Sequence, residues 1–490
     1  MTEHKMRWLP WLPFMVAATF CLGWLFRPLW FDEALTLVEF VGLEHPADIY
    51  WRYNIPNNHI LFTFLLRGWV ELAAACGAAA DFIDRGLPLL ITAGALAAAF
   101  VCWRKVGGTS ATTLLLLAFV LSRPFEIYSL ALRGYMLSFL LVTLGVDAFR
   151  RWQETGKYRY CGSYFLAALA AAATIPSNLV AFAAIPLILL PDCGKEIFRP
   201  RFLLPAILPV VAFFLFYLPI WPKLMGNIAL REGWYDREAA IRIVYGGYFY
   251  AMFPLLAAAA PAALRSWRTR PGWNRWGRLT VILLPLLVWP LLRPYPFPRV
   301  WFCLWPVWML LVVAGLRPVL TGLERRHGIT RVMLIGVAAV VFWGLANREV
   351  SRQVSGLLVG EKGLDDYFAP YYLSDYDPVG VVKEINDAPS GVFLSFNADR
   401  YPLIYYAGIS GAKPEAWFFD RPDRPPMTAL PEGCLVVLAA RENPVEIESR
   451  FNGRLIPWKR HGYHAIYRWE KNYGNSGSAV VTGKGAEQKK

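Results

Sequence analysis

Two adjacent carboxylates follow directly on the first long apolar segment of the chain. Asp32 and Glu33 lie in "LWFDEALTLVEF", residues 29–40. A carboxylate beside low-dielectric surroundings can act as a general base or bind a metal ion. The alternative interpretation is structural, because acidic residues at a helix N-terminus stabilise the helix dipole. The pair is therefore a candidate catalytic site whose role depends on its neighbours.

Arginines recur at the ends of other apolar segments. Guanidinium groups are well suited to binding phosphate through paired hydrogen bonds. Each arginine alone could instead extend toward lipid headgroups. Several of them together with an acidic pair favour a substrate site that binds an anion. The arginines are Arg85, Arg123, Arg133, Arg293 and Arg299.

The composition indicates a protein that crosses a membrane many times. Of its 490 residues 56% are hydrophobic and only 18% are charged, and the mean hydropathy is +0.36. The 21 Trp and 23 Tyr agree with this class, because these aromatic residues gather at membrane interfaces. We expect a polytopic all-α bundle with membrane lipids as its surroundings.

Eleven apolar stretches approach the length that a membrane-spanning helix needs. One further stretch, residues 59–80, carries Arg67 and Glu71 near its middle, and a charge at the centre of a spanning helix is costly. The eleven stretches lie near residues 8–26, 86–103, 106–122, 134–149, 160–175, 178–191, 202–220, 246–264, 279–292, 300–316 and 332–346.

The distribution of basic residues selects a topology. If residues 59–80 form an interfacial or re-entrant helix, the inner loops carry a large excess of Lys and Arg, as cytoplasmic loops do. Counting 59–80 as a span would send the basic loops outward. We therefore expect about eleven spans in residues 1–346, the N-terminus inside, and the loop 27–85 at the outer face. Loop charge then accounts for the net charge of +14, and no nucleic-acid partner is expected.

The composition changes after residue 346. "VVKEIND" has helical spacing, whereas "GVFLSF", "CLVVLAA" and "HAIYRWE" are typical of short strands. We expect a small extracytoplasmic α/β domain at 347–471, followed by a Gly/Ser/Lys-rich disordered tail at 472–490.

Several segments resemble a known family of membrane enzymes. "WFDEALT", "NNHILFTFLLRGW", "DRGLPLLITAGALAAAFVCWRKVGG" and "IYSLALRGYMLSFLL" are similar to the polyprenyl-phosphate-sugar glycosyltransferases of the C-type (GT-C) membrane fold. These include protein O-mannosyltransferases and lipid A aminoarabinose transferases. The likeness covers roughly the first 160 residues, and "PYPFPRVWFCLWPVWMLL" resembles a later helix of the family.

The resemblance implies roles for individual residues. Asp32 matches the catalytic aspartate, which is expected to deprotonate the acceptor hydroxyl. Glu33 is expected to position this base or to help hold a divalent metal ion, whose other ligands stay unknown. Arg85 matches the arginine that binds the lipid-linked phosphate.

Three further positions also correspond to the family, although one of them lies in a segment that departs from the family's pattern. Arg133 and Tyr135 correspond to an R-x-Y pattern at the outer end of a later span. His59 corresponds to the histidine of a His-Pro-Pro segment, although Ile60 and Leu61 replace both prolines here. We expect all three, together with Arg123 and Arg299, to bind substrate.

These residues would suffice for sugar transfer. A phosphate leaving group needs little protonation, so arginines that stabilise the departing charge and one carboxylate base are enough. Attack opposite the phosphate would invert the anomeric centre. The expected partners are a polyprenyl-phosphate-linked sugar donor and an extracytoplasmic acceptor, which is a glycolipid, glycan or protein. The alternatives are a transporter or flippase for lipid-linked saccharides, which would not need Asp32, and a catalytically idle member of the fold.

Overall fold

The computed structural model divides the chain into two compact units. A helical unit comprises Met1–Arg27 and Leu35–Ala369, and a C-terminal unit comprises Pro28–Ala34 and Pro370–Lys490. The short segment 28–34, which carries the acidic pair, therefore groups with residues far away in the sequence. The structure describes residues 8–55, 58–78, 80–189, 200–229, 275–288, 298–359 and, with short gaps, 376–471.

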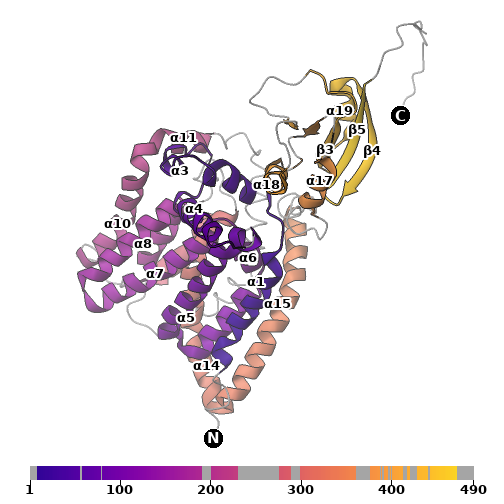
Figure 1. Ribbon diagram of the computed structural model, residues 1–490. Helices are drawn as coiled ribbons and strands as arrows, with labels where there is room; N and C mark the ends of the chain where they lie inside the picture. Colours follow the sequence, from indigo (N-terminus) through magenta and orange to yellow (C-terminus); the bar gives the residue numbers. More distant parts are fainter. Residues whose placement is uncertain are drawn as a thin grey trace, which may run out of the picture. The chain divides into compact units, whose positions relative to one another are not determined.

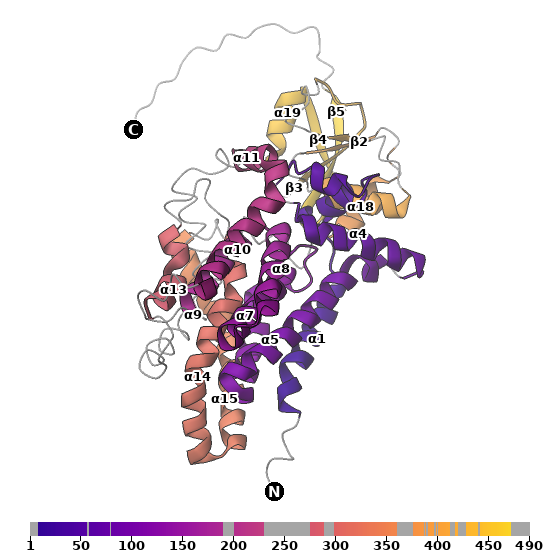
Figure 2. The same cartoon turned by 90° about the vertical axis from the view of Figure 1, so that its left-hand side faces the viewer.

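The helical unit is built from helices that pack on partners both near and far in the sequence, since α14 also packs against α5. α7 packs against α8, and α8 against α10, as Figures 1 and 2 both show. The elements are η2 (Leu9–Trp11), α1 (Leu12–Leu25), η3 (Thr36–Val41), α3 (Asp48–Trp51), α4 (Ile60–Ala75), α5 (Ala80–Val120), α6 (Arg123–Tyr128), α7 (Tyr135–Thr155), α8 (Tyr158–Thr174), α9 (Asn178–Leu189), α10 (Pro200–Tyr217), η5 (Leu218–Ile220), α11 (Trp221–Ala229), α13 (Arg275–Val288), η7 (Pro298–Leu304), α14 (Trp305–His327) and α15 (Ile329–Val359).

Four helical stretches within the described residues are long and apolar enough to cross a membrane, judged by length and composition. They are Ile83–Val120, Leu203–Ala229, Trp301–His327 and Ile329–Ala346. Wherever a predicted span falls on described residues, the chain is helical there except at one or two terminal residues of some spans. The stretch 246–264 lies outside the described residues, and the expected number of eleven crossings stays a prediction.

One long helix, α5, occupies two predicted spans. The sequence predicts a break at Arg104 and Lys105, but the helix continues through them to Gly108, where φ is 79° and ψ is 172°. Such a positive φ is readily adopted only by glycine. The backbone therefore kinks at Gly108, and the two halves of α5 contact α1, α7 and α14.

The charged residues of the contested stretch 59–80 lie on helix α4. The Arg67 guanidinium donates to the carbonyl oxygens of Leu43 (2.5 Å) and Glu44 (3.3 Å). It also pairs with the Glu71 carboxylate at 2.9 Å. Arg67 thus satisfies carbonyls just beyond the π-helical turn η3, which agrees with an amphipathic helix. Its position relative to a membrane stays a prediction.

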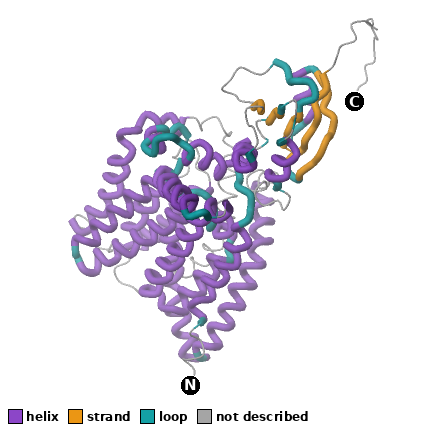
Figure 3. Tube along the Cα trace, in the orientation of Figure 1, coloured by secondary structure: helices purple, strands orange, loops and turns teal. Residues whose placement is uncertain are grey.

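The C-terminal unit contains a five-stranded mixed sheet, in the order β2-β1-β3-β5-β4. The pairs β2–β1 and β1–β3 are parallel, and β3–β5 and β5–β4 are antiparallel. Figure 3 shows the described strands gathered in this unit. The predicted helix and three predicted strands are confirmed. The elements are α2 (Phe31–Leu35), α17 (Pro378–Ile385), β1 (Val392–Leu394), α18 (Arg400–Ser410), β2 (Trp417–Phe419), β3 (Leu435–Ala439), α19 (Pro444–Phe451), β4 (Gly453–His461) and β5 (His464–Lys471).

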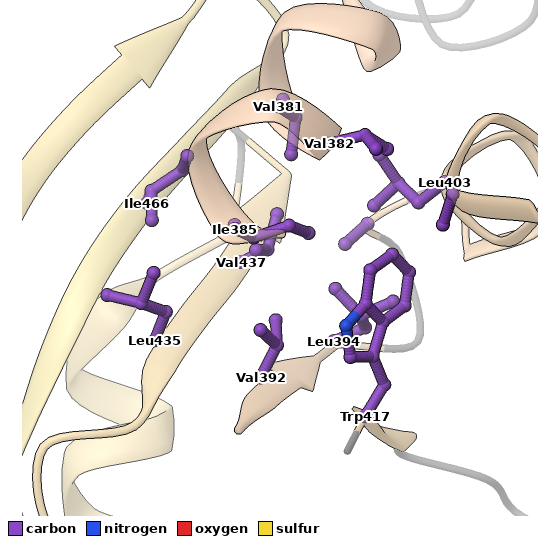
Figure 4. Close-up of a cluster of buried hydrophobic side chains, with 12 residues drawn as sticks. Val381, Val382, Ile385, Val392, Leu394, Leu403, Trp417, Leu435, Val437 and Ile466 are labelled. Atoms are coloured by element: carbon purple, nitrogen blue, oxygen red, sulfur yellow. The ribbon is translucent and has the colours of Figure 1, made fainter. Parts of the chain in front are cut away.

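Alternating side chains of the sheet enter two separate cores, because successive residues of a strand face opposite sides. On one face, Val392, Leu394 and Val437 pack with α17 and α18. Figure 4 shows Leu403 of α18 pointing into this cluster near Val382. On the other face, Phe393 and its neighbours pack against α19. Helix α18 is thus anchored in one of the two cores.

Candidate active site

The acidic pair opens the short helix α2. The Trp30 backbone N–H donates to Glu33 Oε2 at 3.2 Å, and the Ala34 N–H donates to the Trp30 carbonyl at 2.9 Å. This is half of a capping box, in which the third helical residue reaches back to the N-cap. Glu33 is 1% exposed, whereas Asp32 is half-buried. Glu33 therefore shapes the turn, and Asp32 retains access to solvent.

Within the helical unit, the structure brings three of the predicted site residues together. Nη2 of Arg133 lies 3.1 Å from Nε2 of His59, and the Gly134 N–H donates to His59 Nδ1 at 2.8 Å. The rings of His59 and Tyr135 meet edge to face, with centroids 5.4 Å apart. All three residues are at most 5% exposed. This His59 cluster joins the start of α4 to the start of α7.

The contacts of His59 fix the position of its proton. A neutral imidazole has one N–H and one acceptor nitrogen. Because Nδ1 accepts from Gly134, Nε2 carries the proton and faces the Arg133 guanidinium, donor to donor. Two N–H groups whose nitrogens are 3.1 Å apart can both reach one oxygen of a bound anion. The cluster is therefore suited to binding an anionic group.

The close approach of His59 requires the glycine at position 134. A Cβ atom on Gly134 would clash with Thr174 Cγ2 and lie 3.1 Å from His59 Nδ1. Only hydrogen fits between the two side chains. The "RGY" sequence therefore supplies the arginine, the space for His59 and the tyrosine in three consecutive residues.

Arg85 supports the loop that leads to Arg133. Its Nη1 donates to the Leu130 carbonyl at 2.6 Å, and its Nη2 donates to the Arg27 carbonyl at 3.2 Å. Thr92, also on α5, donates to the Ser129 carbonyl. Arg85 is 5% exposed. At least part of its hydrogen-bonding capacity thus holds backbone in place, a role that the sequence did not indicate.

Two of the remaining predicted arginines are placed only by their backbones, and Arg293 lies outside the described residues. Arg123 begins α6 and Arg299 lies in η7, and their side chains fall outside the described part of the chain. η7 nevertheless lies near the His59 cluster, because the ring centroids of Phe302 and Tyr128 are 4.8 Å apart and those of Tyr128 and Tyr135 are 4.6 Å apart.

Tyr128 is a neighbour of the site that the sequence did not single out. It is 8% exposed and packs between Tyr135 and Phe302. The sequence offered little indication of this role, because aromatic residues in apolar stretches commonly pack in a protein core.

The structure divides the predicted site residues between the two units. Asp32 and Glu33 belong to the C-terminal unit, whereas His59, Arg85, Arg133 and Tyr135 belong to the helical unit. Among the described residues, no group of three or more His, Cys, Asp or Glu side chains is placed to hold a metal ion. The expected divalent metal ion stays a prediction.

Comparison with solved structures gives the fold. ArnT from Cupriavidus metallidurans, bound to undecaprenyl phosphate, aligns with a TM-score of 0.53 and 11% identity over 93% of this chain and 97% of that chain. The chain shares its fold with ArnT. This is the GT-C fold of membrane glycosyltransferases, as the sequence resemblance implied.

Other alignments are weaker. The apo form of the same ArnT aligns with a TM-score of 0.49 and 12% identity over 93% of this chain and 97% of that chain. The Archaeoglobus fulgidus oligosaccharyltransferase, in complex with Zn and sulfate, aligns with a TM-score of 0.45 and 11% identity over 94% and 73%. No family model matches the sequence, and neither does any curated protein.

Proposed function

We propose that this protein is a multi-pass enzyme of the cytoplasmic membrane that transfers a sugar from a polyprenyl phosphate to an acceptor on the outer side. The observation that carries the proposal is the fold shared with ArnT, whose complex contains undecaprenyl phosphate. The fold alone does not define chemistry. The residues of this chain must therefore supply the phosphate site and the base.

The His59 cluster is the proposed phosphate site. Arg133 carries a permanent charge and presents several N–H groups in one plane, and Nε2–H of His59 lies next to it. Both groups are buried, where hydrogen bonds to an anion are stronger than in water. Tyr135 lines the same place through its ring. This arrangement would stabilise negative charge as the phosphate departs.

Asp32 is the proposed general base. It lies in the first turn of α2, which the Glu33 cap holds in shape. In the reaction, the acceptor oxygen bonds to the anomeric carbon while the bond from that carbon to the phosphate oxygen breaks. Asp32 takes the hydroxyl proton, and the polyprenyl phosphate leaves with the bonding electrons. Attack from the side opposite the phosphate inverts the anomeric configuration. A general base contributes about 10²–10⁴-fold in rate.

The test is an Asp32→Asn variant of the full chain in lipid nanodiscs. With a panel of undecaprenyl-phosphate-linked sugars and envelope extracts, the wild type should release undecaprenyl phosphate and glycosylate an acceptor, both followed by mass spectrometry. Asp32→Asn should lose at least about 100-fold in rate and keep the wild-type melting temperature.

The matched control is Asp48→Asn in the same predicted outer loop. Asp48 forms an ion pair with Arg52 at 3.1 Å near the surface, which is worth little, so this variant should retain activity. Full turnover by Asp32→Asn would rule out the proposed base. A wild type that moves lipid-linked saccharide across a vesicle membrane without releasing undecaprenyl phosphate would instead identify a flippase.

A further inference from the structure

The segment that carries Asp32 is held by the C-terminal unit. The Leu29 backbone N–H donates to the hydroxyl oxygen of Tyr406 at 2.8 Å. Two residues further along, the Phe31 ring meets the Tyr401 ring edge to face, with centroids 5.1 Å apart. Both tyrosines lie on α18. One polar and one aromatic contact therefore lie on either side of Trp30, and the aromatic one is made by the residue directly before Asp32.

Helix α18 is a rigid support for these contacts. Leu403 and Ala407 are fully buried in the sheet core, and Tyr406 packs against the same cluster. Figure 4 shows Leu403 pointing into this core. The Tyr401 ring is 5% exposed, and its hydroxyl accepts from Arg400 Nη2 at 3.3 Å. Buried side chains in a packed core keep one conformation, so the two tyrosines present a fixed surface to residues 28–34.

The contacts with α18 add to the hydrogen bonds made within the segment. Pro28 has no N–H, so Leu29 provides the first backbone donor of the segment, and Tyr406 accepts from it. The next donor, on Trp30, is satisfied by Glu33. α2 is too short to be stable by itself. Tyr406 and Glu33 thus fix the entry to the turn at which Asp32 sits.

We infer that Tyr406 and Tyr401 are positioning residues for Asp32, and that the C-terminal unit takes part in transfer by holding the segment that carries the base. The inference rests on the proposed function of Asp32. Neither tyrosine is assigned a contact with substrate. Their effect is exerted through Leu29 and Phe31, and a displacement of a catalytic group by about 1 Å can cost about 100-fold in rate.

The test compares Tyr406→Phe with Tyr467→Phe in the full chain. Tyr406→Phe removes the hydroxyl that accepts from Leu29 and retains the ring that packs on the core. Tyr467 lies on β5 and packs on the other face of the same sheet, so its variant makes the same chemical change in the same unit. We expect Tyr406→Phe to lower kcat about 10- to 100-fold with an unchanged KM for the lipid donor and an unchanged melting temperature. Tyr467→Phe should leave kcat at the wild-type value.

Hydrogen exchange of peptides covering residues 27–35 gives a readout that does not require activity. Tyr406→Phe, and Tyr401→Leu as a second variant, should each accelerate exchange in these peptides at least tenfold, while exchange in β1 and β3 stays unchanged. Wild-type exchange in residues 27–35 of Tyr406→Phe, or a wild-type kcat, would overturn the positioning role.

The two proposals fail in different ways. Suppose that Asp32→Asn turns over normally while Tyr406→Phe accelerates hydrogen exchange in residues 27–35. Asp32 is then not the base, and the contact with α18 has a structural role without a catalytic one. If Asp32→Asn is inactive and Tyr406→Phe is fully active, the proposed role of Asp32 as general base is supported and the positioning role of Tyr406 is rejected.

Discussion

Nε2 of His59 lies 3.1 Å from Nη2 of Arg133, and with Gly134 bound to Nδ1 both atoms are donors. Two donors turned toward each other repel, so this geometry favours a bound acceptor that both can share. A phosphate oxygen is such an acceptor. Substitutions at this pair of residues are therefore the best test of where the lipid-linked phosphate binds.

Arg133→Ala is expected to raise the KM for the lipid donor about 10- to 100-fold, because a hydrogen bond to a charged group contributes about 1.5–3 kcal/mol. Binding of undecaprenyl phosphate, followed by native mass spectrometry, should weaken to the same extent. The control is Arg151→Ala on α7, the helix that begins two residues after Arg133; Arg151 pairs with Asp147 at 2.6 Å. Gly134→Ala should reproduce part of the loss, since a Cβ would displace His59. Unchanged donor affinity in Arg133→Ala would exclude this cluster as the phosphate site.

Glu33 can be tested for a capping role against a metal-binding role. Glu33→Gln keeps an oxygen that accepts from the Trp30 N–H, so we expect transfer within about threefold of the wild type. Glu33→Ala removes the cap, which costs about 1 kcal/mol, and should lower kcat. The rate of sugar transfer is measured for the wild type and for both variants, before and after treatment with a chelator. An inactive Glu33→Gln together with loss of wild-type activity in chelator would indicate that Glu33 binds a metal.

Arg85→Ala is expected to reduce stability more than donor affinity. Its guanidinium donates to the carbonyls of Leu130 and Arg27, and each buried acceptor that loses its donor costs about 1–3 kcal/mol. Thermal unfolding in detergent should show a lower melting temperature. Arg104→Ala, an exposed arginine on the same helix, should change the free energy of unfolding by no more than about 0.5 kcal/mol. An unchanged melting temperature with a raised donor KM would instead support direct phosphate binding by Arg85.

His464 should make the C-terminal unit less stable in mild acid. Its pKa is lowered from 6.5 to about 4, chiefly by burial and to a smaller extent by the charge of His461, while the Ala398 backbone and the Asp377 carboxylate act in the opposite direction. Between these pH values the unfolded chain binds the proton that the folded unit does not. Stability is therefore fully present above pH 6.5 and falls as the pH approaches 4, by up to about 3 kcal/mol.

Hydrogen exchange of the β3 and β5 peptides, corrected for the intrinsic effect of pH, would measure this loss. His464→Leu should flatten the dependence between pH 6.5 and 4. His45→Gln, at an exposed histidine in the other unit, should leave it unchanged. A wild-type slope in His464→Leu would assign the effect to another group.

Patterns local in sequence predicted the fold well. The strands around Phe393 and Val436 were recognisable as short apolar runs, whereas the GT-C fold was implied by the resemblance of the segments around Asp32 and Arg133 to a known family. The predicted break in α5 was wrong by a few residues, because a charged Arg-Lys pair is typical of a loop. In the structure, Arg104 and Lys105 are exposed on the helix. Gly108, three residues further on, was the better signal.

The residues of the candidate site could be named from the sequence, but the contacts between them could not. His59 and Arg133 were both identified, yet nothing in the sequence indicates that Gly134 lets them meet. The tyrosines of α18 resemble ordinary amphipathic residues, and their contacts with Leu29 and Phe31 join segments separated by more than 360 positions. Periodicity cannot reveal such pairings, because they depend on the tertiary structure.

The contact between Leu29 and Tyr406 also sets an order of events during synthesis. Residues 28–34 leave the ribosome long before α18 exists, and closing so long a loop carries an entropic cost that only the folded sheet can offset. The nascent chain would therefore insert its helices while the acid-bearing turn is still unformed. The position of residues 28–34 is therefore set only after the sheet that carries α18 has folded.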